Sequence, residues 1–180
     1  MRIPFDVPSY LDHRSQCRIV ATTPEENPVL WDQFLDGAQE SYTRHGVTAA
    51  LEISAIRDGN TTRLFFAALD HSGTLLGGVR VQGPYSSVDQ AHALVEFDKH
   101  PHGRRHVHAM LDERIEHGVV ELKSAWVAPN APRGRAITAM IAESPAYSTA
   151  LLGARYALAT AASHVRAAWL ETGAVIATQI

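Results

Sequence analysis

Strand-like and helix-like segments alternate along the chain, and this alternation limits the folds available to it. Segments rich in strand-forming residues occupy positions 16–22, 61–69, 74–81, 119–127, 158–161 and 174–180. Only the second and third of these are close neighbours, joined by the short loop Asp70-His71-Ser72-Gly73 that is typical of a hairpin. Helix-like segments fill the other intervals, and such crossovers place helices against the faces of a sheet. The pattern predicts an α/β (α+β) fold with a mixed, mostly antiparallel central sheet flanked by helices on both faces.

The first helix-like segment has a recognisable start and one apolar face. Thr23 provides an N-cap oxygen, Pro24 suits the first helical position, and Glu26 completes a capping box. Apolar residues then recur at helical spacing at Leu30, Trp31, Phe34, Leu35 and Ala38. The sequence therefore predicts a helix that ends near Gly46 and buries these five side chains.

Composition excludes several classes of protein. The chain has 180 residues, of which 46% are hydrophobic and 19% charged, so a wholly disordered chain is excluded. A net charge of −3 disfavours nucleic-acid binding, and a single cysteine excludes an intrachain disulfide. No signal peptide or membrane-spanning run is evident, so we expect a cytoplasmic protein. Residues 1–15 are interpreted as an N-terminal arm and 16–180 as one domain, with a domain of a longer protein as the alternative.

One segment carries most of the chemical information. The strand-like residues 119–127 lead through a loop containing Arg133 and Gly134 into a helix that starts near Arg135. The first N–H groups of a helix have no internal partner, and the helix dipole adds partial positive charge there. Together with the two arginines, this arrangement predicts an anion site suited to a diphosphate.

This segment resembles motif A of the GNAT acyltransferases, in which a strand ending in valine precedes Arg/Gln-x-x-Gly-x-Gly/Ala. The matching frame here is Arg133-x-x-Ala136-x-Thr138, so both usual glycines are replaced. The resemblance covers most of the chain from Gln16 onward and implies that acetyl-CoA or a longer acyl-CoA is the co-substrate. It implies that the pyrophosphate is held by the backbone of Arg133, Gly134, Arg135, Ala136, Ile137 and Thr138. It also implies that Trp126, Val127 and Ala128 line the path of the pantetheine.

The same resemblance assigns a general base but no general acid. Glu121 matches the motif-strand glutamate that deprotonates the attacking primary amine in many GNAT enzymes. The late helix that ends at Gly173 carries Trp169 where many relatives have an acidic tyrosine, and an indole N–H cannot take that role. The implied reaction is direct attack of a small-molecule or peptide amine on the thioester, with Glu121 as base.

A narrower resemblance leads to alternative functions. Gly77-Gly78-Val79-Arg80, followed later by Val120-Glu121-Leu122-Lys123-Ser124, is similar to acyl-homoserine-lactone synthases and long-chain N-acyl amino acid synthases. This branch implies an acyl carrier protein as donor and Arg80 as a substrate-binding residue. The replaced glycines and the missing tyrosine favour another alternative, a non-catalytic GNAT-like domain that binds a ligand or serves as a scaffold.

Four further features carry predictions. Residues 99–106 are interpreted as a basic loop, in which His100, His102, His106 and His108 form two His-x-His pairs. No cysteine or firmly placed carboxylate completes a ligand set there, so no metal site is predicted. The helix after Arg135 is expected to break at Pro145. The strand 174–180 is expected to leave a sheet edge through which two chains form a homodimer.

Overall fold

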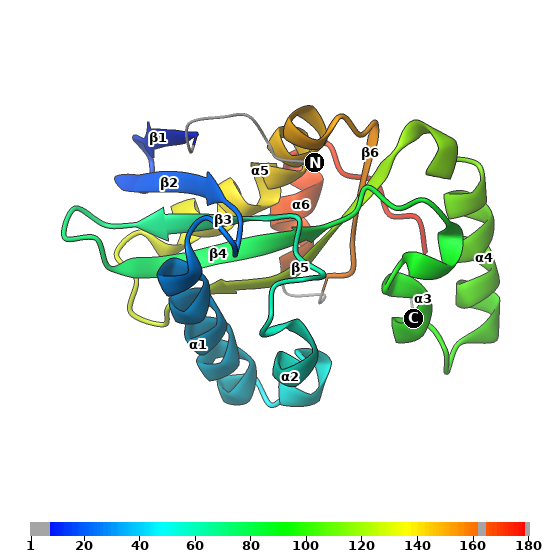
Figure 1. Ribbon diagram of the computed structural model, residues 1–180, viewed down its shortest axis with the longest axis horizontal. Helices are drawn as coiled ribbons and strands as arrows, with labels where there is room; N and C mark the ends of the chain where they lie inside the picture. The colour runs from blue at the N-terminus through cyan, green and yellow to red at the C-terminus, as the bar shows by residue number, and fades with distance from the viewer. Residues whose placement is uncertain (1–7, 162–164, 179–180) are drawn as a thin grey trace. The chain divides into compact units, whose positions relative to one another are not determined.

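The structure is a computed structural model that describes residues 8–161 and 165–178. Six strands and six α-helices, with three short 3₁₀ helices, follow one another along these residues (Figure 1). The strands are β1 Ser9–Asp12, β2 Cys17–Thr22, β3 Leu64–Leu69, β4 Leu75–Gln82, β5 Val119–Val127 and β6 Tyr156–Ala159. The α-helices are α1 Pro28–Arg44, α2 Ile53–Ile56, α3 Ala93–Glu96, α4 Pro101–Asp112, α5 Gly134–Leu152 and α6 Arg166–Glu171. The 3₁₀ helices are η1 Thr48–Ala50, η2 Val88–Gln90 and η3 Ile115–His117.

The strands form one sheet in the order β1-β2-β3-β4-β5-β6. β2 pairs with β1 and with β3 in antiparallel register, and the short loop between β3 and β4 makes that pair a hairpin. The Ala128 N–H donates to the Leu76 carbonyl and the Tyr85 N–H to the Val119 carbonyl, so β4 and β5 also run antiparallel. Only β5 and β6 are parallel. The predicted mixed, mostly antiparallel sheet is confirmed, and residues 9–12 of the predicted arm belong to it.

The chain divides into two compact units, which we describe separately. The first contains the described residues up to Arg80 together with Ser124–Ile141, and the second contains Val81–Lys123 and the described residues from Ala142 onward. Each unit has its own cluster of buried apolar side chains. The boundary crosses β4, β5 and α5, so each unit receives part of these elements.

In the first unit, helices cover both faces of the sheet. A Cβ added to Gly77 would lie 3.1 Å from Ile137 of α5, whereas one added to Gly78 would lie 3.1 Å from the Phe34 ring of α1. Consecutive strand residues point to opposite faces, so α1 and α5 pack on opposite sides of β4. The same two Cβ positions would come within 2.7 Å and 2.3 Å of the carbonyl oxygens of Trp126 and Phe66. The absence of side chains at this glycine pair therefore allows the neighbouring backbones to approach β4 closely.

Helix α1 has the predicted buried face but starts later than expected. Leu30, Trp31, Phe34, Leu35 and Ala38 are all at most 7% exposed. The helix begins at Pro28 because the Asn27 side chain accepts from the Leu30 N–H at 3.2 Å. Thr23 caps only the preceding turn, where its hydroxyl accepts from the Glu26 N–H at 3.1 Å. A second local cap therefore displaced the predicted start by one turn.

In the second unit, the predicted basic loop is helical. Helix α4 begins at Pro101, because proline suits the first turn of a helix, and Gly103 packs against the Phe97 ring. Val107 and Leu111 form its buried face. His102, His106 and His108 lie on α4 and His100 precedes it, and all four are exposed. The prediction of a loop was wrong because the apolar face of α4 is short and most residues of this helix are polar.

Two further expectations for the second half of the chain were wrong. Helix α5 continues through Pro145 and does not break there. Proline has no N–H, so the helix lacks one backbone donor at this position. Ser144 and Ser148, on either side of the proline, are fully buried. The residues 174–178 form no strand, and 179–180 lie outside the described residues. β6 is the last strand of the sheet in the described part, and the homodimer expected through this end of the sheet stays a prediction. None of the helices in the described ranges is long and apolar enough to cross a membrane.

Candidate functional site

One residue inside β5 in the first unit, Ser124, has an irregular backbone conformation. Its φ of 53° is left-handed, which is unusual for a residue inside a strand. The nearly buried Arg80, at 3% exposed, donates from Nε to the Ser124 hydroxyl at 3.1 Å and from a terminal nitrogen to the Thr62 hydroxyl at 3.4 Å. Arg80 therefore supports this irregular residue of β5, and its predicted contact with substrate stays a prediction. Residues held in sparse backbone conformations are frequent at functional sites.

Strand β6 accompanies only the first part of β5. The register pairs Val119–Leu122 with Tyr156–Ala159, and β5 then continues for five residues to Val127. On the other side, β5 stays bonded to β4 as far as Ala128, whose N–H donates to Leu76 at 2.8 Å. The last part of β5 thus has one strand edge that β6 does not pair, and such an edge offers N–H and C=O groups to an extended ligand.

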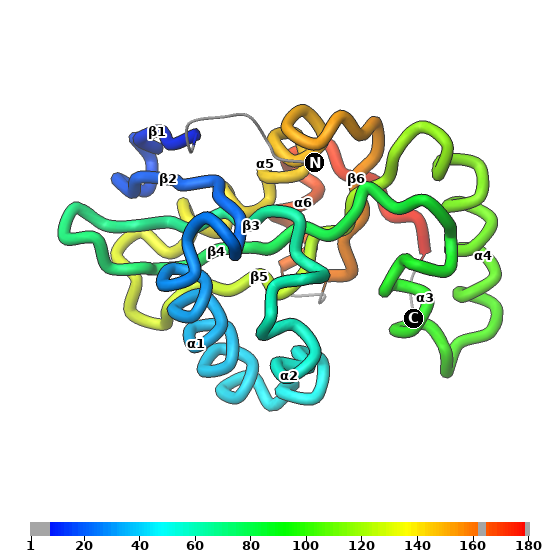
Figure 2. The backbone as a smooth tube through the Cα atoms, viewed as in Figure 1, coloured from blue at the N-terminus to red at the C-terminus, as the bar shows by residue number. Residues whose placement is uncertain are grey.

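The chain reverses direction between β5 and α5 through a tight turn (Figure 2). Arg133 adopts φ 60°, the left-handed conformation, just before the helix begins at Gly134. Arg133 and Arg135 are both exposed, and the first turn of α5 contains no acidic residue. The start of the helix therefore has positive charge with no carboxylate of its own to neutralise it, which suits a bound anion.

The structure narrows the set of amides that was predicted to hold phosphate. The N–H of Gly134 donates to Ala131, and those of Ala136 and Ile137 donate to the Arg133 carbonyl. Within the described residues, the N–H groups of Arg133 and Arg135 donate to no backbone carbonyl. These two residues thus provide both the open amides and the guanidinium groups.

Two other predicted contacts are occupied within the protein. The Thr138 hydroxyl donates to the Gly134 carbonyl at 3.1 Å, so it bonds within its own helix. The Ile137 side chain is fully buried and packs against β4, where it would contact a Cβ at Gly77. These positions contribute to the shape of the helix start, and their contact with a cofactor stays a prediction.

The last residues of β5 point to different faces of the sheet. The Trp126 ring is 7% exposed, lies 6.1 Å from the Phe34 ring and fills the space above Gly37 of α1. This indole is part of the core, so only the backbone of Trp126 remains for a pantetheine chain. Val127 and Ala128 are half-buried, and Val127 lies beside Gly134 at the start of α5.

In the second unit, Glu121 is the centre of a buried polar cluster. Its side chain is 0% exposed, and its Oε2 atom accepts from the Tyr85 hydroxyl and from the His92 backbone N–H, both at 2.8 Å. Its Oε1 atom has no hydrogen-bond partner and lies 3.8 Å from the Lys123 ammonium. One carboxylate oxygen of Glu121 is therefore fixed by two donors, while the other remains able to accept.

Glu96 and Lys123 complete this cluster. Lys123 donates to Glu96 Oε1, and His92 Nδ1 lies 3.6 Å from the same oxygen. Burial opposes ionisation of Glu96, but the nearby His92 side chain and the Lys123 charge outweigh it and lower the pKa of Glu96 to about 2. Glu96 is thus held as a carboxylate next to Glu121.

Sequence reasoning singled out Glu121 but missed its neighbours Tyr85, His92, Glu96 and Lys123. A partial signal was present, because His92 and Glu96 are four residues apart and Glu121 and Lys123 are two apart on one strand. Residues four apart on a helical turn, or two apart on a strand, share one face. Nothing in the sequence indicates that these two faces meet.

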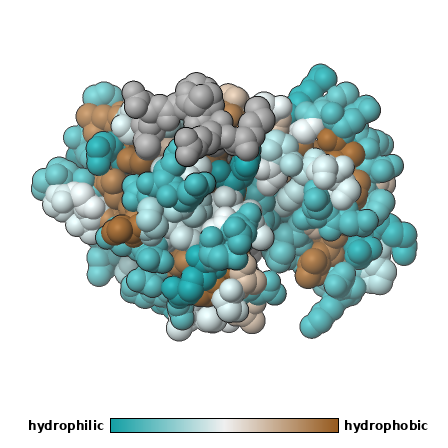
Figure 3. Space-filling model, viewed as in Figure 1, coloured by the Kyte–Doolittle hydropathy of each residue, from teal (hydrophilic) through white to brown (hydrophobic). Residues whose placement is uncertain are grey.

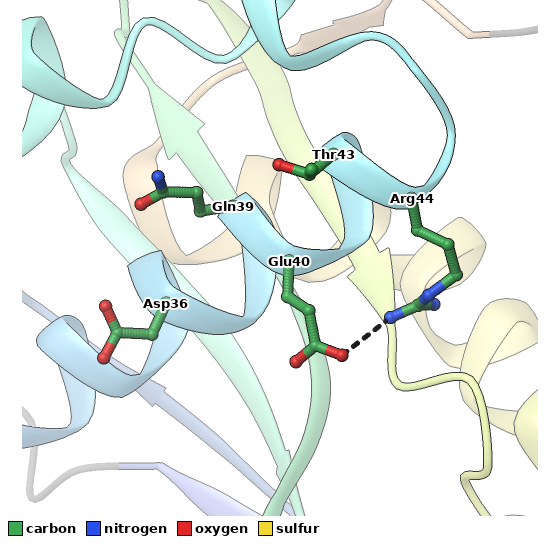
Figure 4. Close-up of a pocket in the computed structure, with 5 residues that line it drawn as sticks. All are labelled: Asp36, Gln39, Glu40, Thr43 and Arg44. Carbon is green, nitrogen blue, oxygen red and sulfur yellow. Dashed lines mark hydrogen bonds and ion pairs between the residues drawn. The ribbon is translucent and has the colours of Figure 1, made fainter.

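A surface hollow on the first unit is not part of the candidate site. It is lined by Asp36, Gln39, Glu40, Thr43 and Arg44, all exposed residues of α1 (Figure 4). Glu40 and Arg44 form an ion pair across one helical turn, at 3.1 Å. Because one helix supplies every lining residue, the hollow has no opposing wall that could hold a ligand.

The α+β fold of this chain is similar to that of a solved structure. A crystal structure of a probable acetyltransferase matches 88% of this chain and 90% of its own chain, with a TM-score of 0.54 and 15% identity. At that level of identity the likeness concerns the fold.

Sequence relatives are found in mycobacteria. Uncharacterized proteins of Mycobacterium bovis and Mycobacterium tuberculosis are each 44% identical to this chain over 166 residues. The match covers 92% of this chain, which spans 63% of the length of these relatives. No protein-family model matches the chain.

Proposed function

We propose that this protein is an N-acyltransferase that moves an acyl group from acyl-CoA to a primary amine. The observation that supports this most is the segment from Ser124 to Arg135 on an acetyltransferase-like fold. In this segment, one edge of β5 is left unpaired by β6, and the start of α5 carries two exposed arginines and no acidic residue. An extended amide chain that ends in a diphosphate, which is the chemical form of CoA, is complementary to both parts.

In this proposal, the first unit binds the cofactor. Arg133 and Arg135 contact the phosphates through their guanidinium groups and their free backbone amides. The backbone of Trp126, Val127 and Ala128 pairs with the amides of the pantetheine. A charge-assisted hydrogen bond from an arginine to a phosphate contributes about 1.5–3 kcal/mol, so the two arginines account for a large share of the affinity for CoA.

Glu121 is the proposed general base. The amine nitrogen attacks the thioester carbon, the carbon–sulfur bond breaks, and CoA leaves as a thiolate that takes its proton from solvent. The proton released by the amine passes to Glu121 Oε1, directly or through a water molecule, because that oxygen has no hydrogen-bond partner in the structure. Tyr85 and the His92 N–H hold the other oxygen and so orient the carboxylate.

The acyl donor and acceptor separate this proposal from its close alternative. If the protein is a long-chain N-acyl amino acid or acyl-homoserine-lactone type synthase, an acyl carrier protein replaces CoA as donor. Turnover assays with acetyl-CoA, long-chain acyl-CoA and acylated carrier protein, each against a panel of amines, distinguish the two. Faster turnover with the carrier protein would favour the synthase.

Calorimetry with CoA and acetyl-CoA tests the binding part of the proposal. We expect the double variant Arg133→Gln/Arg135→Gln to lose affinity by at least about tenfold, following the energy of one charged hydrogen bond. Arg57→Gln is the matched control, because Arg57 is exposed and its hydrogen bonds are made by its backbone, which donates to Ile53 and accepts from the Trp31 indole N–H. No binding by the natural protein at millimolar CoA would contradict the proposal.

The variant Glu121→Gln tests the chemical step. A glutamine retains an acceptor oxygen for Tyr85 and His92, so the cluster keeps these two bonds while losing its base. We expect unchanged CoA affinity and a loss of thiol release of about 100-fold or more. Full turnover in this variant would remove the assignment of Glu121. CoA binding by the natural protein without thiol release over the amine panel would favour a non-catalytic ligand-binding domain.

A further inference from the structure

Three buried polar atoms of the second unit have no hydrogen-bond partner among the described residues, and they face one cluster. They are His92 Nδ1, Glu96 Oε2 and Glu121 Oε1. Buried polar atoms are nearly always satisfied, so three orphans together require an explanation. Glu121 is completely buried, which makes the cost of its unpaired oxygen especially large. A bound cation would satisfy all three atoms at once.

The geometry of the cluster suits a small metal ion. One ligand atom each from His92, Glu96 and Glu121 lies within 4.8 Å of the others. Ligand atoms bound to zinc stand about 3.4 Å apart, given metal–ligand distances near 2.1 Å. His92 Nδ1 lies 3.6 Å from the other oxygen of the Glu96 carboxylate, Oε1, so the imidazole and this carboxylate are already close together.

The local structure also supports such a set. His92 precedes helix α3 and Glu96 ends it, so one helical turn supplies two ligands and β5 supplies the third. The Tyr85 hydroxyl and the His92 N–H hold Glu121 Oε2 and leave Oε1 free, the kind of outer contact that orients a metal-binding carboxylate. One imidazole and two carboxylates are a common donor set for zinc and for other divalent transition metals.

Lys123 is the competitor for this position. Its ammonium contacts Glu96 and lies 3.8 Å from Glu121 Oε1, so it neutralises part of the negative charge. It leaves the three orphan atoms unsatisfied, however, because none of them accepts a hydrogen bond from it. A lysine side chain has a flexible four-carbon stem and can turn away when a dication binds.

We propose that His92, Glu96 and Glu121 form a binding site for a divalent transition metal such as Zn²⁺, with Lys123 as an internal competitor for the site. The inference goes beyond the proposed acyl transfer and does not depend on it. It has one consequence for that reaction: a Glu121 that coordinates metal is no longer free to accept a proton. Occupancy by metal would therefore inhibit an enzyme that uses Glu121 as its base.

Titration of the purified, metal-stripped chain with Zn²⁺ alone, followed by calorimetry, tests the site. We expect one ion per chain in the natural protein and a loss of affinity of more than about tenfold in His92→Ala and in Glu96→Gln. Lys123→Met should bind more tightly than the natural protein. Circular dichroism of each variant establishes that the fold is retained, and two separate ligand variants guard against the failure of one.

The control is His102→Ala, which removes an exposed histidine of α4 and should leave Zn²⁺ affinity unchanged. Loss of binding in this control would show that the surface histidines hold the metal and would overturn the proposal. Equal affinity in the natural protein, His92→Ala and Glu96→Gln would also overturn it. So would binding in Lys123→Met alone, because Lys123 would then fill the site in the natural chain.

Discussion

The substitution Gly37→Ala tests where the Trp126 side chain lies, and hence which part of β5 is left for a ligand. Alanine is the better helix former by about 1 kcal/mol, so on propensity alone this change in the middle of α1 should stabilise the protein. The structure predicts the opposite. A Cβ at position 37 would lie 2.1, 2.3 and 2.7 Å from three carbons of the Trp126 ring.

The expected magnitude follows from that geometry. Carbon atoms in contact are normally about 3.5–4.0 Å apart, so the ring would have to retreat by more than an ångström. It is 7% exposed and packed against Phe34, which leaves little room to move. Overpacking of this kind costs about 1–3 kcal/mol. After the gain in helix propensity, we expect a net loss of roughly 1–2 kcal/mol.

Urea unfolding followed by circular dichroism measures the free energy of unfolding, and a thermal scan should show a fall of about 2–4 °C for each kcal/mol lost. The same change in a Trp126→Phe background is the internal control. A phenyl ring is shorter than an indole, so Gly37→Ala should be neutral or stabilising there. A stabilising Gly37→Ala in the natural protein would refute the placement of Trp126 in the core against α1.

Two other predictions concern the phosphate turn and the buried cluster. Arg133→Gly should raise the free energy of unfolding by about 1 kcal/mol, because glycine adopts the left-handed conformation of this position without strain. The same change should weaken CoA binding in calorimetry. A less stable variant would contradict the left-handed conformation of Arg133. The lowered pKa of Glu96, about 2 against 4.5 unperturbed, means that this group stabilises the fold above pH 4.5 and that the contribution disappears as the pH falls toward 2. Unfolding of the natural protein and of Glu96→Gln across this range should show a stability difference that shrinks by up to about 3 kcal/mol; a difference that stays constant would exclude an ionised, ion-paired Glu96.

Hydrophobic surface is dispersed on the face shown in Figure 3, where brown patches alternate with hydrophilic side chains. Among the described residues, the exposed large apolar side chains include single residues such as Val29 at 69% and two neighbouring pairs, Tyr10 with Leu11 and Val175 with Ile176. Single exposed apolar residues are normal on protein surfaces. The homodimer stays a prediction, and light scattering measures the oligomeric state.

The sequence by itself determined the features that depend on neighbouring residues. The apolar spacing in α1, the bounds of β5 and the close approach at Gly77-Gly78 all follow from periodicity and from the absence of a side chain. The mixed, mostly antiparallel sheet could be predicted for the same reason, although β1 lies in the predicted arm. Four local predictions were wrong, at the start of α1, at Pro101, at Pro145 and in the expected strand 174–180, because caps, short amphipathic faces, prolines and short apolar runs are weak signals.

Only the tertiary structure decided which distant residues meet. The Glu121 cluster brings together His92 and Glu96 from one helical turn with residues of β5, and packing alone determines that these faces touch. Packing also placed the Trp126 ring in the core rather than beside a ligand. Residue spacing fixes which side chains share a face, whereas the partner of that face depends on how the elements pack, a choice made by many weak contacts at once.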